Sequence, residues 1–463
     1  MSKSSFTIWL LALGLMLICS CVNLETSETL FLAGQYAEAA NELPSPQPEP
    51  KYLLADLYRA SAHLMAADYG PALEALSAAE GILDEQDQSL NWGGHYLGRS
   101  YDGLMLHTYQ ALVYLIQGNR SFARVALNRL EERQGKAARR NAKAIEQTQR
   151  EIAEERDAQQ EPGAVECLEL AGQNAENQQK LTEYQHLLDQ WGAYADFESP
   201  AGRFLSGVFR LLYQEDQSDA EKAVFQLKRC YGTTNAETAR ILYDLAEGRA
   251  AGKIPREELD DLVVVLFENG LGPVKQEVRY EILVPLNRPV YAGIALPILV
   301  ERPAAYARLD LYNGFSRLGE TRPLCSIDRL VATEFRKEMP WLVAKAVTGT
   351  VLKVAAQVLI STAVKEQYGQ GWGLAASIIG AGVAYATTNA DVRGWNLLPK
   401  EFQAAVLRRP ESGLLGIHQP NAAMPFVQVE LPPGPALVYV KIPAPGLPAL
   451  VTVTGPANAP RGQ

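Results

Sequence analysis

Four segments in the first half of the chain repeat one pattern, in which an apolar helical run, a short polar turn and a second apolar run follow one another. Small residues recur in the second run, and Ala39, Ala72 and Ala123 are 33 and then 51 residues apart. Two helices cross closely only where small side chains face each other, while larger ones fill the space beside them. The pattern therefore predicts a stack of helix pairs, the fourth at residues 202–232 around Ala223.

A tyrosine lies near the turn in each of the first three copies, at Tyr36, Tyr69 and Tyr114. The order of glycine, tyrosine, alanine and leucine resembles the tetratricopeptide repeat (TPR), although the 51-residue step makes the array irregular. The resemblance implies a TPR-like array with a concave surface for a protein or peptide. We expect the three tyrosines to fill helix crossings or to face that partner.

A polar segment of mixed charge follows the third copy, at residues 131–162. Its helix propensity is high and it lacks a wide apolar stripe. We expect it to extend the preceding helix as an exposed arm that ends at Pro162. A partner-binding coiled coil is the alternative, although no heptad pattern is sustained.

The pattern changes at residue 261 to short β-branched runs, with turn signals such as Asn269-Gly270 between them. The sequence therefore predicts an α+β chain, with an N-terminal TPR-like helical domain at 21–260 and a β-rich domain at 261–463. Residues 274–313 alternate well enough to form a meander. Charge divides at the same boundary: the first part has 23 basic and 38 acidic side chains, the second 19 and 15. Opposite net charges would help the two parts dock.

Two apolar helical stretches interrupt the strands at residues 340–390. The first contains Lys345, Lys353 and Lys365, and the second, residues 372–388, is uncharged and rich in small residues. Small residues allow two helices to pack tightly in water or in lipid. We expect an apolar helical hairpin packed on protein, and insertion into a bilayer is the alternative.

The first twenty residues read as a secretory signal, with Lys3 before an apolar run from Phe6 to Ile18. The following residues, Leu-Ile-Cys-Ser-Cys, resemble a bacterial lipobox with Cys21 as the residue to be lipidated. The resemblance implies a mature protein that is anchored to the membrane by acyl chains on Cys21. Because Val22 rather than an aspartate follows, it also implies the periplasmic face of the outer membrane.

Few residues suggest chemistry. The net charge of −10 argues against a nucleic-acid surface, and the five histidines form no close metal-ligand pair, so we expect neither a metal nor another cofactor. Once Cys21 is lipidated, the mature chain keeps the thiols of Cys167, Cys230 and Cys325, which we expect to be buried and free. A glycine-rich loop with His95, Arg99 and Asp102 is the one candidate for a hydrolase. No catalytic residue is otherwise predicted.

The sharpest polar motif of the second half is Asp391-Val-Arg393-Gly-Trp395. An aspartate two residues from an arginine can form a charge-assisted hydrogen bond that fixes the chain as it leaves the hairpin. Because no nucleophile or base accompanies Asp391 and Arg393, we expect a structural or partner-contact role for them and for Trp395.

Four segments together resemble a functionally uncharacterised family of bacterial TPR-like outer-membrane lipoproteins. They are residues 101–119, 199–211, 263–277 and 390–399, and the family usually has Asn-Pro at Ser199-Pro200. The resemblance implies an outer-membrane-attached periplasmic protein without established catalysis, and a loose association with lipoproteins that regulate peptidoglycan synthesis.

Lipobox, repeats and family resemblance together predict a non-enzymatic, lipid-anchored periplasmic adaptor for an unidentified envelope protein. A membrane-inserting assembly or export component that uses residues 340–390 is the alternative, and an envelope hydrolase is a weaker one. The sequence carries no signal for the oligomeric state.

Overall fold

The computed structural model describes residues 24–88, 95–368 and 389–455. The fold is a mixture of helix and sheet, 54% helical and 18% strand, which confirms the α+β class. Cys21 and the second apolar stretch, residues 372–388, lie outside the described residues.

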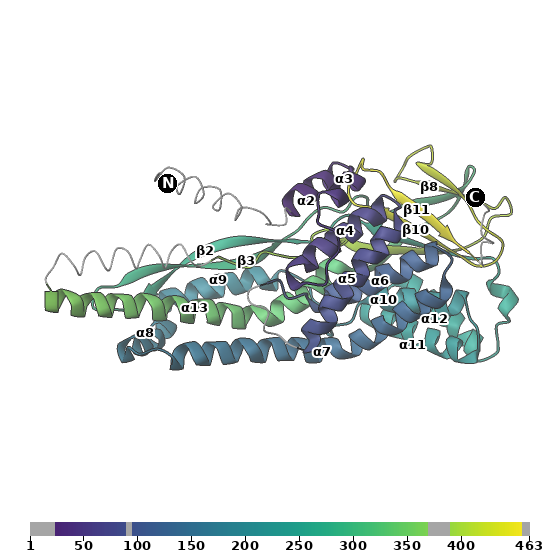
Figure 1. Ribbon diagram of the computed structural model, residues 1–463. Helices are drawn as coiled ribbons and strands as arrows, with labels where there is room; N and C mark the ends of the chain where they lie inside the picture. The colour runs from purple at the N-terminus through teal and green to yellow at the C-terminus, as the bar shows by residue number, and fades with distance from the viewer. Residues whose placement is uncertain (1–23, 89–94, 369–388, 456–463) are drawn as a thin grey trace, which may run out of the picture.

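Helices dominate the chain up to residue 250 (Figure 1). Successive helices pack as pairs, α2 with α3, α4 with α5, α6 with α7 and α10 with α11. The small residues Ala39, Ala72, Ala123 and Ala223 are all fully buried, so the helices approach closely there. The helices are α2 (Leu24–Leu32), α3 (Tyr36–Asn41), α4 (Leu53–Met65), α5 (Tyr69–Gln88), α6 (Ser100–Ile116), α7 (Arg120–Asp157), α8 (Pro162–Gln173), α9 (Ala175–Asp189), α10 (Pro200–Leu212), α11 (Gln217–Thr234) and α12 (Glu237–Ala250), with short 3-10 turns at Pro50–Tyr52 and Arg256–Leu259.

The predicted exposed arm needs correction. Residues 131–157 do extend the preceding helix, as the second half of α7, but they pack along α13 (Ile327–Tyr368). Asn141 is buried and donates to Glu338 of α13, whereas the buried Gln134 accepts from the backbone N–H of Ser199. The helix ends at Asp157, and Pro162 begins α8 instead, where its missing N–H costs no hydrogen bond.

The strands form three sheets. The largest has the order β11-β10-β1-β7-β6, in which β1 and β10 are parallel and the other neighbours antiparallel. A small sheet, β5-β4-β8-β9, and a two-stranded ribbon, β2-β3, complete the set. The strands are β1 (Leu262–Asn269), β2 (Val274–Val284), β3 (Val290–Val300), β4 (Asp310–Asn313), β5 (Ser316–Glu320), β6 (Arg322–Ser326), β7 (Glu401–Arg408), β8 (Leu414–His418), β9 (Val427–Glu430), β10 (Ala436–Ile442) and β11 (Leu450–Thr454).

The predicted meander at residues 274–313 is wrong in its last strand. β2 and β3 pair over their whole length, but β4 joins the small sheet and pairs with β5 and β8. Alternation of apolar and polar residues indicates that one face of a strand is buried, but it does not indicate which sheet the strand joins.

Helix α13 begins at Ile327, earlier than the apolar stretch at residue 340 suggested, and Pro340 lies inside it. Its 42 residues make it about 63 Å long at 1.5 Å per residue. It contacts α7, α8 and the β2-β3 ribbon, and these elements form the elongated arm on the left of Figure 1. Among the described residues, Ile327–Ile360 is the one helical stretch long and apolar enough to cross a membrane.

One buried apolar cluster extends from the first helices to β10 and the start of β11, so residue 260 is no break in the core. The central strand β1 is buried on both faces. Val264 and Leu266 face the helices, whereas Val263 and Val265 belong to a second cluster with Leu311 and other residues of the small sheet. The large sheet is thus a middle layer between the helices and the small sheet.

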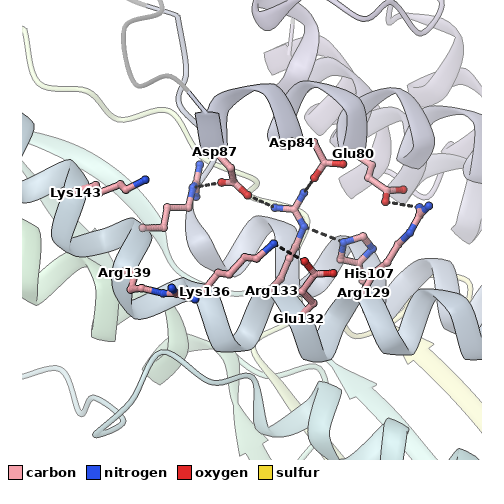
Figure 2. A pocket seen from close by; sticks show the side chains of 11 residues that line it. Glu80, Asp84, Asp87, His107, Arg129, Glu132, Arg133, Lys136, Arg139 and Lys143 are labelled. Atoms are coloured by element: carbon pink, nitrogen blue, oxygen red, sulfur yellow. Dashed lines mark hydrogen bonds and ion pairs between the residues drawn. The ribbon is translucent and has the colours of Figure 1, made fainter.

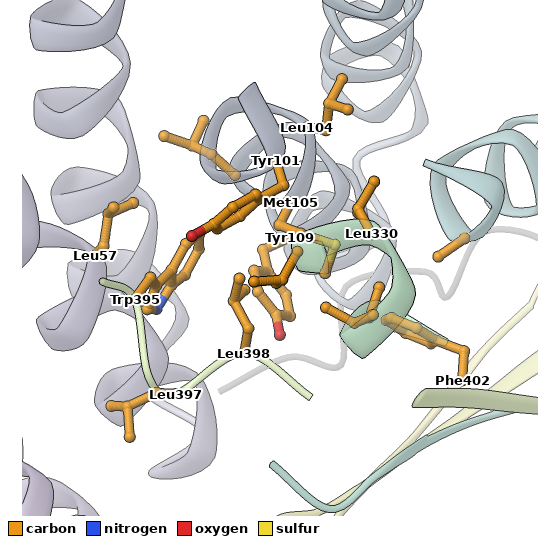
Figure 3. Packing of buried hydrophobic residues seen from close by; sticks show 14 of the residues in the cluster. Leu57, Tyr101, Leu104, Met105, Tyr109, Leu330, Trp395, Leu397, Leu398 and Phe402 are labelled. Carbon is orange, nitrogen blue, oxygen red and sulfur yellow. The ribbon is translucent and has the colours of Figure 1, made fainter. Parts of the chain in front are cut away.

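The loop after α13, described at residues 389–400, packs into the main cluster through Trp395, Leu397 and Leu398 (Figure 3). The Trp395 ring lies 5.6 Å from the ring of Tyr109 on α6, centroid to centroid. Its indole N–H donates to Ser61 Oγ of α4 at 2.9 Å. A loop from the second half therefore fixes two helices of the first.

Candidate functional site

An open groove lies between α5 and α7 (Figure 2). Its volume is about 620 Å³, and six basic and four acidic side chains line it together with His107. The basic side chains come from one face of α7, where their spacing of three or four residues matches the helical period. They are Arg129, Arg133, Lys136, Arg139, Arg140 and Lys143.

Arg133 lies at the centre of the groove. Its guanidinium pairs with Asp84 and Asp87 of α5, and its Nε donates to His107 Nε2 at 2.9 Å. Burial and the neighbouring Arg133 lower the pKa of His107 to about 4, so the imidazole is neutral at physiological pH and can accept this hydrogen bond. Arg140 also pairs with Asp87, at 2.8 Å. The inner part of the groove is therefore fixed by ion pairs.

The outer part of the groove contains basic side chains without an acidic partner. Lys136 pairs with Glu132 one helical turn away. Within the described ranges, the exposed side chains of Arg139 and Lys143 form no ion pair. Two cations at the rim are thus available to an anionic group from outside.

A polar junction of buried charges lies where the N-terminus of α6 meets α13. Arg99 pairs with Glu338, and the Ser100 N–H donates to Glu334 Oε2 at 2.9 Å. Asn141 of α7 donates to Glu338 Oε1 at 3.1 Å. Burial, with the nearby Glu338 carboxylate, raises the pKa of Glu334 to about 7. The junction joins α6, α7 and α13 and holds a carboxyl group that is protonated in part at neutral pH.

The residues considered for a hydrolase do not assemble into one. Asp102 Oδ2 accepts from the backbone N–H of Arg99 at 2.8 Å and from the Tyr96 hydroxyl at 2.7 Å, so it caps its own helix. His95 is exposed, and no hydrogen bond or ion pair in the described part of the chain links it to Arg99 or Asp102.

Asp391 and Arg393 are exposed and pair with each other, whereas Trp395 is buried. Arg393 Nε donates to Asp391 Oδ1 at 2.8 Å and its Nη2 to Oδ2 at 3.0 Å, a bidentate pair within the loop. Trp395 is 3% exposed and lies in the core as described above. The Gly394 carbonyl accepts from Tyr58 at 3.3 Å, which ties the loop to α4.

The three repeat tyrosines have different surroundings. Tyr36 is buried, and its hydroxyl donates to the carbonyl of Pro448 near the C-terminal end of the chain, at 2.9 Å. Tyr69 is half-buried beside the core. Tyr114 stacks on Phe122 of α7 with ring centroids 5.3 Å apart. None of them lines the groove between α5 and α7.

Sequence reasoning missed a buried ionic network beneath α6. Lys441 of β10 pairs with Glu268 of β1, and both side chains are at most 2% exposed. Tyr109 donates to Glu268 Oε1 at 2.6 Å and accepts from Lys441 Nζ at 3.0 Å. A charged residue in each of two continuous apolar strands was the available signal, since charges are almost never fully buried unless paired.

Comparisons with protein-family models, curated proteins and solved structures found no match to this chain. Within the described residues there is also no group of three or more histidine, cysteine, aspartate or glutamate side chains placed to hold a metal ion.

Proposed function

We propose that this chain is a lipid-anchored, non-enzymatic adaptor at the periplasmic face of the outer membrane, in which a TPR-like helical array binds an acidic segment of an envelope protein. The observation that carries the proposal is the open groove between α5 and α7, with six basic against four acidic side chains. This local excess of positive charge occurs on a chain whose net charge is −10. It would attract an acidic segment and orient it along α7.

Preorganisation of the groove adds support. Arg133 and Arg140 are fixed by Asp84 and Asp87, so little conformational entropy is lost there on binding. Arg139 and Lys143 at the rim are exposed, and their attraction for a partner is screened by salt. Binding through them would therefore weaken as ionic strength rises.

A photoreactive amino acid at Lys136, which is exposed in the groove lining, tests the groove when it is introduced in living cells. We expect it to cross-link an envelope protein that the same group at Lys222, exposed on α11 outside the groove lining, does not capture. Arg139→Glu with Lys143→Glu should lower the yield of that cross-link, and Lys222→Glu should not. Equal capture from both positions, or turnover of an envelope substrate by protein recovered only as a monomer, would count against the adaptor.

Substitution of Cys21 tests the anchor when the mature chain is exported behind a cleavable secretory signal that has no lipobox. Cys21→Ser then removes the thiol that the lipid requires, so the variant should leave the membrane fraction and appear as a soluble protein. Persistence of the variant in washed membranes would contradict an anchor at Cys21.

Membrane insertion through α13 is a second candidate, because Ile327–Ile360 is long and apolar enough to span a bilayer. Its contacts with α7, α8 and β3 favour packing on protein instead. Ile360 is 47% exposed, so a cysteine at this position should react with a water-soluble maleimide. Protection that appears only when lipid vesicles are added would support insertion over packing.

A further inference from the structure

A second cavity, of about 380 Å³, lies between α13 and the β2-β3 ribbon and shares no lining residue with the charged groove. This volume is within the range of small-ligand pockets. One wall is Leu296 of β3, and the other is an apolar stripe of α13 formed by Phe335, Met339, Leu342 and Ala346.

The stripe has the spacing of one helical face, with steps of three or four residues. The apolar stripe extends from Phe335 to Ala346, about 17 Å at 1.5 Å per residue, and beyond it the α13 lining continues with Gly349, Thr350 and Lys353. An extended apolar wall of this kind matches a linear hydrocarbon chain better than a compact ligand.

The polar lining of the cavity is mainly cationic. Arg99, Lys275, Lys345 and Lys353 line it. Arg99 and Lys345 have carboxylate partners, Glu338 and Glu151. Lys275 donates to the backbone carbonyl of Arg393 at 3.0 Å, and in residues 24–88, 95–368 and 389–455 it forms no ion pair. A half-buried ammonium group without a carboxylate partner is a ready contact for an anion.

Two acidic side chains also line the cavity, and Asp391, which is close enough to act on the charge of Lys275, offsets part of this positive charge. Asp391 is held in its bidentate pair with Arg393. Glu155 lies against the backbone of α13, with its carboxylate 3.0 Å from where a Cβ on Gly349 would be. The cavity also contains an unsatisfied hydrogen-bonding group. The Thr350 hydroxyl is 2% exposed and has no hydrogen-bond partner in the described structure.

We propose that this cavity binds a single-chain amphiphile with an anionic head group, its hydrocarbon chain along the α13 stripe and its head group paired with Lys275. A carboxylate and a phosphate head share the chemistry that Lys275 recognises, and Thr350 supplies a hydroxyl donor in the same cavity. The site is separate from the partner groove, so its failure would leave the adaptor proposal unaffected.

Calorimetric titration of the mature chain, residues 21–463 with Cys21→Ser in place of the lipid anchor, tests the site. The probes are dodecanoate, dodecyl phosphate, the cationic dodecyltrimethylammonium and inorganic phosphate. We expect saturable binding of the anionic amphiphiles and none of the cationic one. Binding of both anionic chains points to a general anion site, and binding of one alone identifies its head group. Inorganic phosphate should bind far more weakly, because it lacks the chain.

Variants locate the binding. Lys275→Met keeps the shape of the side chain and removes its charge, so it should weaken dodecanoate binding roughly tenfold. Ala346→Trp should abolish it by filling the cavity, and Lys143→Met in the charged groove should leave it unchanged. Thermal unfolding of each variant shows that the fold is retained. Absence of saturable binding would overturn the proposal, and so would equal affinity for the cationic probe.

Discussion

At the scale of single residues, the middle sheet contains a buried ionic network. Glu268 and Lys441 form a pair in the middle sheet, and Tyr109 and Tyr439 bond to the same carboxylate. A buried pair contributes little net stability, but the loss of one partner leaves an uncompensated charge. Such a network specifies which strands and which helix meet.

Lys441→Met tests this network. The variant leaves Glu268 buried without its cation, so we expect a loss of about 3–5 kcal/mol in the free energy of unfolding, measured in urea. Adding Glu268→Gln removes the stranded charge and should restore part of that loss. If Lys441→Met alone were as stable as the parent chain, the assigned pairing of Glu268 with Lys441 would be contradicted.

Glu334 predicts a dependence of stability on pH. Its pKa is raised from 4.5 to about 7 in the folded chain, so between these values the folded state binds the proton more tightly than the unfolded state does. Its contribution to stability is therefore present at pH 4.5 and is lost as the pH rises through 7. Glu334→Gln mimics the protonated form, so the variant should gain stability relative to the parent between pH 5 and pH 8, by an amount on the order of 1 kcal/mol or more. The exposed Glu221→Gln should show no such trend, and an unchanged difference across this range would contradict the prediction.

At the scale of elements, close helix crossings depend on glycine as well as alanine. In the α10–α11 pair, a Cβ at Gly207 would lie 2.5 Å from Leu227 Cγ. Small side chains at these crossings explain why the repeats are visible in the sequence at all.

Gly207→Ala should therefore destabilise the chain by about 1–3 kcal/mol through overpacking. Leu227→Ala in the same chain should relieve the clash, so the double variant should lose less than the sum of the two single variants. Gly232→Ala on α11 is the matched control, because nothing lies within 4 Å of its Cβ position, and it should be neutral or stabilising. Thermal unfolding followed by circular dichroism distinguishes these outcomes, and equal effects of both glycine substitutions would refute the crossing.

At the scale of the whole molecule, the helices and the large sheet share one core. Trp395 is a central contact, since it joins the loop after α13 to α4 and α6. A shared core predicts that helices and sheet unfold together rather than as two units.

Trp395→Ala should lower the free energy of unfolding by about 3–5 kcal/mol and keep a single transition. Circular dichroism reports the helices, and hydrogen exchange at β1 reports the sheet, so the two midpoints should shift together. Separate midpoints would show that the two parts fold independently.

Much of the local structure could be predicted from the sequence. The β-branched runs became β1, β2, β3, β10 and β11, and the repeated small residues are buried where helices cross. These features repeat with the period of a strand or a helix, so a short window contains their signal. The candidate groove was not predicted, because three of its four acidic side chains come from α5 and all of its basic ones from α7.

The sequence by itself determined the α+β composition, the positions of several strands and the helix pairing of the first half. Only the tertiary structure decided that β1 lies parallel to β10, that residues 131–157 pack along α13, and that Trp395 enters the core of the first half. The physical reason is the range of the interactions. Propensity and periodicity act between neighbours along the chain, whereas burial and charge pairing act between residues such as Glu268 and Lys441, which are neighbours only after folding.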